Sequence, residues 1–398
     1  MKTTTGRQRC AGRRAVAAAF LAATSAAAFA QVWMQTSAPI TNWVAVACSA
    51  DGSKLVATAN GGFGNAGPIF ISADSGATWM QTSAPLTNWS SVASSADGIK
   101  LAAVSYRGVF TSADSGATWT ATDGPGDRRI VSSADGTRLV VSSGYRSTNS
   151  GANWTQLPAS GWCIASSADG VKLVLAYFNH NGFPQGCICV STNSGATWTQ
   201  TSAPLYSWTG WTALASSADG TKLAATIGYT SFPTGPGPIY VSPDGGGTWQ
   251  ASGSPTSHWA AVACSADGMR LVATTSFGGI YTSTDWGVTW VSNNVPVTDW
   301  SAVACSADGT KLVAVVDGGG IWTAQVPPVP LLSIAQLDTN VVLSWTVPSA
   351  DFTLQENLDL NSTNWTDVTA TPTLNLTTLH NEVVLPAPTG NRFYRLKH

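Results

Sequence analysis

The sequence predicts an all-β fold, a seven-bladed β-propeller followed by a small β-sandwich domain. The tetrapeptide Ser-Ala-Asp-Gly occurs seven times, each time followed by one variable residue and then a basic one. The spacing runs from 34 residues between Asp135 and Asp169 to 50 between Asp169 and Asp219, and β-branched runs flank each copy. Self-similarity at this spacing is typical of a propeller, and seven copies predict seven blades. The repeat aspartates are Asp51, Asp97, Asp135, Asp169, Asp219, Asp267 and Asp308, and their basic partners are Lys54, Lys100, Arg138, Lys172, Lys222, Arg270 and Lys311.

The first copy shows how one repeat predicts four strands. Residues 44–48 alternate as an inner strand, Ser-Ala-Asp-Gly turns the chain, and residues 54–59 return as the second strand. Residues 69–71 form the third strand and 78–81 the outer one. In the turn, Asp51 can accept hydrogen bonds from nearby backbone amides while Gly52 takes a positive φ. The seven aspartates are therefore interpreted as turn residues.

A second motif, Ser-x-Asp-x-Gly-x-Thr-Trp or a close variant, lies between the third and fourth predicted strands of a repeat. Its acidic or amide residues are Asp74, Asp114, Asn149, Asn193, Asp244 and Asp285. The Asp or Asn can accept turn amides, the Gly supplies a positive φ, and the Trp packs between sheets. A metal-binding or catalytic role is the alternative. We favour the structural role, because the same turn recurs around the ring whereas an active site occurs once.

The second motif is that of the bacterial neuraminidase repeat, and residues 31 to about 326 resemble the Asp-box propellers. These include sialidases, sortilin-type receptors and the photosystem II assembly-factor propellers. The resemblance implies the fold and leaves the function open, because those families share the blade and not the chemistry.

The two ends of the repeat region are predicted to close the ring together. Residues 31–39 nearly duplicate residues 77–85, which end a blade, so they form an outer strand without its first three strands. The last repeat supplies three strands, at 302–306, 311–316 and 320–324, and no fourth. We expect residues 32–36 to pair with the strand around residues 320–324.

Residues 1–30 have the pattern of a secretory signal peptide. A basic segment precedes an apolar stretch from Ala15 to Ala28, and Ala28-Phe29-Ala30 fits the small-x-small cleavage rule. Removal of the five leader bases would leave 14 basic against 21 acidic residues, a net charge of about −7. This balance disfavours nucleic acid or an anionic membrane as a partner. We expect a secreted, periplasmic or cell-surface protein and a monomer.

The composition changes after Val326. Residues 327–330, Pro-Pro-Val-Pro, predict a stiff linker, and residues 331–398 carry alternating runs without either repeat motif. Both glutamates of the chain, Glu356 and Glu382, lie in this last part. It resembles the small fibronectin-like β-sandwich modules that end many secreted bacterial proteins, which implies a spacer or attachment role.

Residues 31–326 lack several residues that a sialidase-like active site requires. A sialidase-like site, as the resemblance implies, uses three dispersed arginines, a tyrosine activated by a glutamate, and an acid-base aspartate. Residues 31–326 contain no glutamate, and the arginines outside the repeat positions cluster in two adjacent blades. We therefore expect a non-catalytic interaction protein that binds a protein segment or a glycan, with no catalytic residues and no cofactor. A divergent sialidase-like or other glycoside hydrolase is the alternative.

Candidate binding residues gather in the connections on the face opposite the two hairpin motifs, where loops of unequal length carry aromatic and basic side chains. They are Tyr106, Arg107, Asp127, Arg128, Arg129, Tyr145, Arg146, His180, Phe183, Tyr229 and Phe232. In the third blade Asp127 stands where five other blades carry Trp eight residues before the repeat aspartate, and Trp162 is displaced from that register by one residue. Guanidinium groups suit carboxylate ligands. An Asp–Arg network that only braces a short blade is the alternative.

Six cysteines follow the leader: Cys48, Cys163, Cys187, Cys189, Cys264 and Cys305. Cys48, Cys264 and Cys305 share one register, directly before Ser-Ala-Asp-Gly. Buried thiols are the expectation, and export leaves disulfides open. Cys187-x-Cys189 places two thiols on one face of a strand, which is a weak indication of zinc, and we expect no metal site.

Overall fold

The computed structural model describes residues 31–325 and 332–397, apart from 62–65, 178–185, 206–209, 229–235, 347–352, 360–361, 363, 376–379 and 389. These residues form two compact units, 31–325 and 332–397, and each is described by itself. The predicted signal peptide and the predicted linker 327–330 lie outside the described residues.

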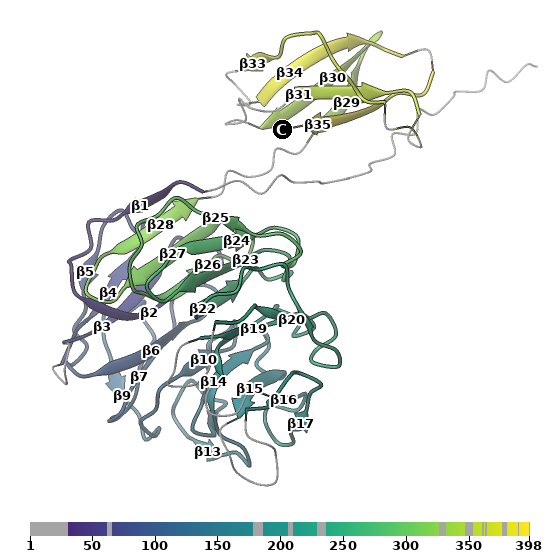
Figure 1. Cartoon of the computed structure of the whole chain (residues 1–398). Helices are drawn as coiled ribbons and strands as arrows, with labels where there is room; N and C mark the ends of the chain where they lie inside the picture. The colour runs from purple at the N-terminus through teal and green to yellow at the C-terminus, as the bar shows by residue number, and fades with distance from the viewer. Residues whose placement is uncertain are drawn as a thin grey trace, which may run out of the picture. The chain divides into compact units, whose positions relative to one another are not determined.

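Seven four-stranded antiparallel sheets make up the described part of the first unit (Figure 1). One of them joins β2 (Asn42–Cys48), β3 (Leu55–Asn60), β4 (Ile69–Ser72) and β5 (Met80–Gln81) in sequence order, as the first repeat predicts. The next five sheets repeat this order. They are β6 (Trp89–Ser94) to β9 (Thr120–Ala121) with β7 (Leu101–Ser105) and β8 (Gly108–Ser112); β10 (Ile130–Ser132), β11 (Leu139–Val141), β12 (Tyr145–Ser147) and β13 (Thr155–Gln156); β14 (Gly161–Ser166), β15 (Leu173–Tyr177), β16 (Ile188–Ser191) and β17 (Thr199–Gln200); β18 (Trp211–Ser216), β19 (Leu223–Ile227), β20 (Tyr240–Ser242) and β21 (Gln250–Ala251); and β22 (Trp259–Cys264), β23 (Leu271–Thr275), β24 (Ile280–Ser283) and β25 (Val291–Ser292).

The remaining sheet joins the two ends of the unit. It contains β26 (Trp300–Cys305), β27 (Lys311–Val316), β28 (Ile321–Gln325) and, at its outer edge, β1 (Trp33–Gln35). Trp33 pairs with Ala324, and the Thr36 amide donates to the Ile321 carbonyl at 2.8 Å. The pairing predicted for residues 32–36 is therefore confirmed.

A ring of backbone hydrogen bonds links the seven sheets at their Ser-Ala-Asp-Gly turns. The alanine amide of each turn donates to the alanine carbonyl of the next, over distances of 2.6 to 2.8 Å. The donors, in order, are Ala50, Ala96, Ala134, Ala168, Ala218, Ala266 and Ala307, and the last bonds to the carbonyl of Ala50. The ring of sheets is thus closed.

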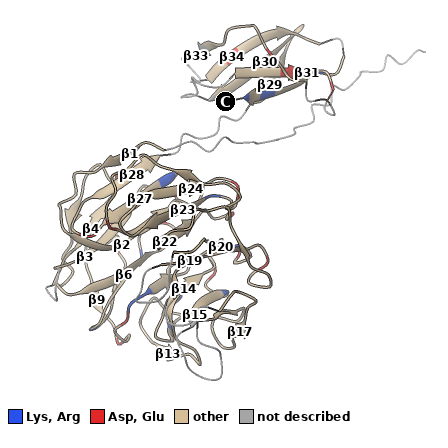
Figure 2. Ribbon diagram, in the orientation of Figure 1, with Lys and Arg blue, Asp and Glu red and all other residues tan. Residues whose placement is uncertain are grey.

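The repeat glycines and basic residues also join neighbouring sheets. Gly98 has a φ of 66°, and a Cβ there would lie 2.7 Å from Cδ of Lys54 in the preceding sheet. Only glycine satisfies both conditions without strain. Three lysines reach the next turn, because Nζ of Lys100, Lys172 and Lys222 donates to the carbonyl of Asp135, Asp219 and Asp267. Figure 2 shows the basic residues on the ribbon.

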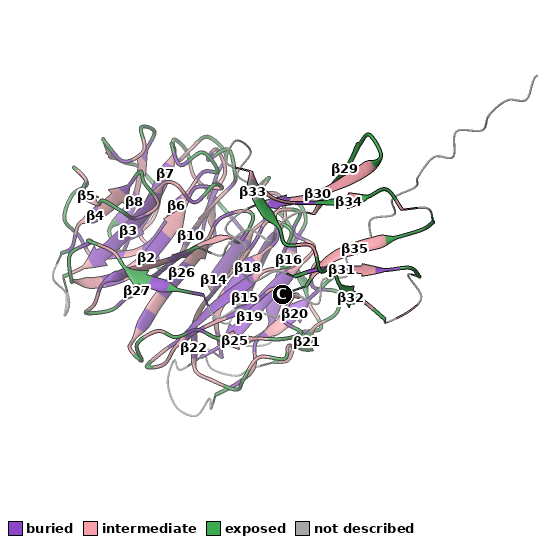
Figure 3. Ribbon diagram, turned by 90° about the horizontal axis from the view of Figure 1, so that it is seen from above, coloured by how far each residue is buried: buried purple, intermediate pink, exposed green. Residues whose placement is uncertain are grey.

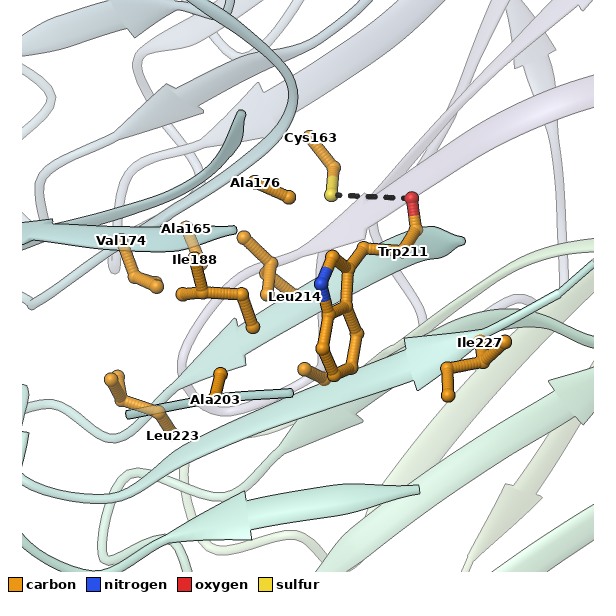
Figure 4. Close-up of a cluster of buried hydrophobic side chains, with 11 residues drawn as sticks. Cys163, Ala165, Val174, Ala176, Ile188, Ala203, Trp211, Leu214, Leu223 and Ile227 are labelled. Atoms are coloured by element: carbon orange, nitrogen blue, oxygen red, sulfur yellow. Dashed lines mark hydrogen bonds between the residues drawn. The ribbon is translucent and has the colours of Figure 1, made fainter. Parts of the chain in front are cut away.

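The hydrophobic core lies between neighbouring sheets, and buried residues run along strands such as β14 and β15 (Figure 3). Five tryptophans at the starts of inner strands are at most 2% exposed: Trp43, Trp89, Trp211, Trp259 and Trp300. Trp43 meets Phe70 edge to face at 5.5 Å. Figure 4 shows one cluster, in which Trp211 packs with Cys163, Val174 and Leu223. An aromatic of this kind buries on the order of 150–250 Å². These tryptophans therefore pack between sheets and are not available for stacking on a ligand.

The second unit contains two antiparallel sheets. One has the order β29 (Ser333–Leu337), β30 (Asn340–Thr346), β34 (His380–Pro386), β33 (Thr373–Asn375), and the other β32 (Thr366–Asp367), β31 (Thr353–Asn357), β35 (Phe393–Lys397). Leu343, Trp345, Leu354 and Val383 from both sheets form its core. In neither unit do the described residues form a helix long and apolar enough to cross a bilayer.

Candidate functional site

Asp127 occupies the position before β10 where other sheets carry the buried tryptophan. It is 9% exposed, and its amide donates to the Ser105 carbonyl at 3.0 Å. Its carboxylate accepts the Ser143 amide at 2.5 Å, the Arg128 amide at 2.6 Å, and the Ser142 hydroxyl at 3.0 and 3.1 Å. Asp127 therefore braces the turn between β11 and β12, which is a structural task.

The Asp–Arg network considered as the alternative does not form among the residues that the structure describes. Asp127 bonds to the backbone of Arg128 and not to its guanidinium, and the one ion pair in those ranges, Arg392–Glu356, lies in the second unit. The Arg128 side chain is exposed, and its guanidinium carbon lies 4.1 Å from the ring centre of Trp162 and 5.9 Å from that of Tyr106. Contacts of this kind contribute roughly 0.5–1 kcal/mol at exposed sites and leave the cation free to meet an anion.

Arg129, next along the chain, is partly buried. Burial lowers the pKa of its guanidinium and the neighbouring Arg128 lowers it further, whereas the Cys163 thiol acts in the opposite direction. Arginine nevertheless stays protonated in proteins at neutral pH. No hydrogen bond or ion pair from its side chain reaches a residue in the described ranges. Arg128 thus lies beside Trp162 and Arg129 near Cys163, and neither guanidinium forms an ion pair with an acidic residue of the described ranges.

Tyr106 and Arg107 form the two-residue turn between β7 and β8, and both are exposed, Tyr106 by 64%. The Arg107 amide donates to the Ser105 hydroxyl at 3.2 Å. The chain that leads to Asp127 crosses this turn closely, because a Cβ at Gly126 would lie 2.0 Å from the Tyr106 carbonyl oxygen. Tyr106, Arg107, Arg128, Arg129 and Trp162 therefore form one corner, called the arginine corner below.

The structure removes Tyr145 and Arg146 from this group. Both lie in β12 and not in a loop, because Gly144, with a φ of 85°, ends the preceding turn. Arg146 Nη1 donates to the Ser194 carbonyl at 2.6 Å in the hairpin of the next sheet. Tyr145 packs against the buried cluster that contains Ile130 and Val141. The four candidates His180, Phe183, Tyr229 and Phe232 lie outside the described residues.

The sequence reasoning did not include Trp162 in the site. It follows Gly161 at the start of β14, is only partly buried, and presents its ring to Arg128. The feature of the sequence that could have identified Trp162 is its displacement by one residue from the register of the buried tryptophans.

The hairpin residues of the second motif act as turn acceptors. Asp74 accepts the Thr78 amide and the Ser72 hydroxyl through Oδ1, at 2.9 and 2.8 Å, and the Thr78 hydroxyl through Oδ2 at 2.6 Å. The Thr78 hydroxyl and amide hold the pKa of Asp74 at about 2, below its usual range. The same bonds recur at Asp114, Asp244 and Asp285, and the amide oxygens of Asn149 and Asn193 accept the equivalent backbone N–H.

The six cysteines are free thiols in this structure. Burial raises the pKa of Cys48, Cys163 and Cys264 to about 12, so these thiols are protonated at neutral pH. The sulfurs of Cys187 and Cys189 lie 3.6 Å apart in the core. In the described ranges no group of three or more His, Cys, Asp or Glu residues is placed to hold a metal ion.

Comparison with known proteins identifies the fold. No protein-family model and no curated protein matches the sequence. Among the solved structures that match, "YCF48 bound to D1 peptide" has a TM-score of 0.55 and 15% identity over 76% of this chain and 97% of its own. The β-propeller domain of Cps50 (Swd1) from Myceliophteria thermophila also has a TM-score of 0.55, with 12% identity over 74% of this chain and 100% of its own. The GH74 xyloglucanase from Xanthomonas campestris has a TM-score of 0.54 and 18% identity over 79% of this chain and 59% of its own. The first unit is therefore a β-propeller, and at these identities the likeness extends to the fold alone.

Proposed function

We propose that the chain is an exported, non-catalytic interaction protein, a seven-bladed Asp-box propeller that binds a carboxylate-bearing protein segment at the arginine corner. The observation that carries the proposal is the pair Arg128 and Arg129, whose guanidinium groups have no acidic partner in the described ranges although the protein is acidic overall. The charge of Arg128 opposes the charged form of Arg129, and a ligand anion bound by both groups would offset this repulsion. The terminal β-sandwich module would serve as a spacer or attachment element.

The chemistry of the corner favours a peptide carboxylate. A guanidinium fork binds the two oxygens of a carboxylate together, and Arg107 can add a third cation from the neighbouring turn. Tyr106 and Trp162 flank Arg128 and offer apolar surface to the side chains beside the bound carboxylate. The structural likeness to a propeller solved with a bound peptide agrees with this use of the fold. A glycan remains the other class of ligand.

The test measures binding to two arrays, one of peptides with free or amidated carboxyl ends and one of glycans. We expect affinity for free-carboxylate peptides. Arg128→Ala combined with Arg129→Ala should weaken it at least tenfold, which corresponds to ~1.4 kcal/mol.

Arg392→Ala, which removes an exposed arginine from the second unit, is the matched control and should leave the affinity unchanged. Peptide affinity that survives the double substitution would exclude the arginine corner. Affinity confined to the glycan array would exclude a protein segment as the ligand.

A further inference from the structure

Gln31, two residues before β1, is anchored by a buried asparagine of the neighbouring sheet. The Gln31 amide donates to Oδ1 of Asn293 at 2.7 Å. Asn293 follows β25 and is 5% exposed, and Gln31 is 9% exposed. Nδ2 of Asn293 donates to the Ile280 carbonyl at 3.1 Å and to the Thr282 hydroxyl at 3.2 Å, so the orientation of its Oδ1 toward Gln31 is fixed.

Other sheets provide a different acceptor at this position. Ala77, Ala117 and Ala196 have the register of Gln31, and their amides donate to the carbonyl of their own hairpin residue, Asp74, Asp114 or Asn193. No such motif precedes Gln31 in the sequence. In other sheets a threonine or serine occupies the position that corresponds to Asn293. These residues are Thr82, Thr122, Thr201 and Ser252, and the backbone amide of each donates to a carbonyl next to or in the third strand, as the amide of Asn293 does. The side chain of Asn293 thus provides the acceptor for the Gln31 amide that the carbonyl of a hairpin Asp or Asn provides in other sheets.

The anchor suits a residue with one N–H group and no charge. Oδ1 of Asn293 is the single acceptor for the Gln31 nitrogen, and Oε1 of Gln31 is itself buried without a hydrogen bond. Arg270 and Gln31 line the same narrow recess. A free α-ammonium group would bring three N–H groups and a positive charge into this buried place beside an arginine, and that is costly.

We propose that the mature chain begins at Gln31 and that this residue is converted to pyroglutamate. The proposal uses the leader removal after Ala30 that belongs to the proposed export. The α-amino nitrogen attacks Cδ of its own side chain, a C–N bond forms, the bond from Cδ to Nε2 breaks, and ammonia leaves with the displaced proton. The resulting lactam keeps one N–H for Asn293 and has lost the terminal charge, as other blocking modifications do.

The experiment produces the full chain in an exporting host and measures the intact mass of the undigested, folded protein. The expected mass is that of residues 31–398 less one molecule of ammonia, with no α-amine that reacts with an acylating reagent. A mass corresponding to any other first residue, or a free α-amine on Gln31, would overturn the proposal.

Two variants separate the chemistry from the packing. Gln31→Ala leaves a free amine that cannot cyclise, and we expect its Tm to be lower than that of the wild type. Asn293→Ala should lower the Tm while the loss of ammonia remains. A wild-type Tm in both variants would contradict the anchoring. Neither measurement requires a ligand, so the outcome is independent of the peptide-binding test.

Discussion

At the scale of single residues, the hydrogen-bond partners of Asp127 determine its role. Asp127 was predicted from its place in the tryptophan register, yet its oxygens are occupied by Ser142, Ser143 and the Arg128 backbone. The sequence could show that this position is unusual. It could not show the partners, because they depend on how closely the turn before β12 approaches.

Replacing Asp127 by Ala should lower the free energy of unfolding by about 2–3 kcal/mol. The substitution leaves the buried Ser142 hydroxyl and two backbone amides without an acceptor, and each lost partner costs roughly 1–3 kcal/mol where no water replaces it. Urea unfolding of the variant measures the change. Asp127→Asn keeps one acceptor oxygen and should lose less. An unaltered unfolding midpoint for Asp127→Ala would contradict the bracing role.

The hairpin aspartates should make the propeller sensitive to acid. The hydrogen bonds of Thr78 and Thr118 hold the pKa of Asp74 and Asp114 at about 2, below the value of about 3.9 expected in the unfolded chain. A folded-state pKa below the unfolded one adds stability above the unfolded value, and that stability is lost as the pH falls through the folded value. We therefore expect the Tm to fall between about pH 4 and pH 2.

Asp74→Asn with Asp114→Asn is the matched test of this acid sensitivity. Asn193 already shows that an amide fits the turn, since its Oδ1 accepts the Thr197 amide and its Nδ2 donates to the Thr197 hydroxyl. The double variant should keep its Tm at neutral pH and lose less of it at pH 2. If its Tm falls with acid as steeply as that of the wild type, these carboxylates are not responsible.

At the scale of elements, repeats made the strands predictable and left the connections open. The duplication of residues 77–85 at 31–39 was enough to predict that β1 pairs with β28. The third sheet was harder, because β11 and β12 have three residues each and the Gly144 turn is short. Arg146 therefore lies in a strand and bonds to Ser194, although its place between two repeat motifs suggested a loop.

Deleting residues 31–37 should strongly destabilise the propeller or cause it to aggregate. The deletion removes β1, exposes the backbone edge of β28, and takes Trp33, which is 6% exposed, out of the core. An unpaired strand edge is a site for association with other chains. Thermal unfolding measures the stability of the truncated chain, and light scattering measures its aggregation. The point variant Trp33→Phe, which keeps the strand, is the control. A truncated protein with the wild-type Tm would show that β1 does not close the ring.

At the scale of the whole molecule, the fold does not determine the chemistry. Likeness of fold extends to a xyloglucanase and to a peptide-binding propeller alike. The closed ring and its regular hairpins followed from the repeat, whereas the arginine corner depends on two sheets that depart from the tryptophan register, at Asp127 and at Trp162. The sequence therefore predicted that Arg128 and Arg129 lie together before an inner strand, whereas Tyr145 and Arg146 were expected in a loop and lie in β12.

No hydrolysis of a fluorogenic sialoside is expected from the purified chain. The propeller sequence lacks glutamate, and its arginines outside the repeat positions do not surround the ring. Fluorescence release measured against a buffer control would detect turnover. A rate above the buffer control that survives repurification would favour the glycosidase alternative.

The alanine ring described above also has a direction. Every amide in it donates toward the next sheet in sequence, so the seven N–H···O bonds run in one sense around the ring. An α-helix leaves N–H groups unpaired at one end and C=O groups unpaired at the other. The ring of turns has no such ends, because each alanine both donates one of these bonds and accepts one. An open arc of the same sheets would leave one alanine N–H and one alanine C=O without these partners, so closure of the ring satisfies both groups.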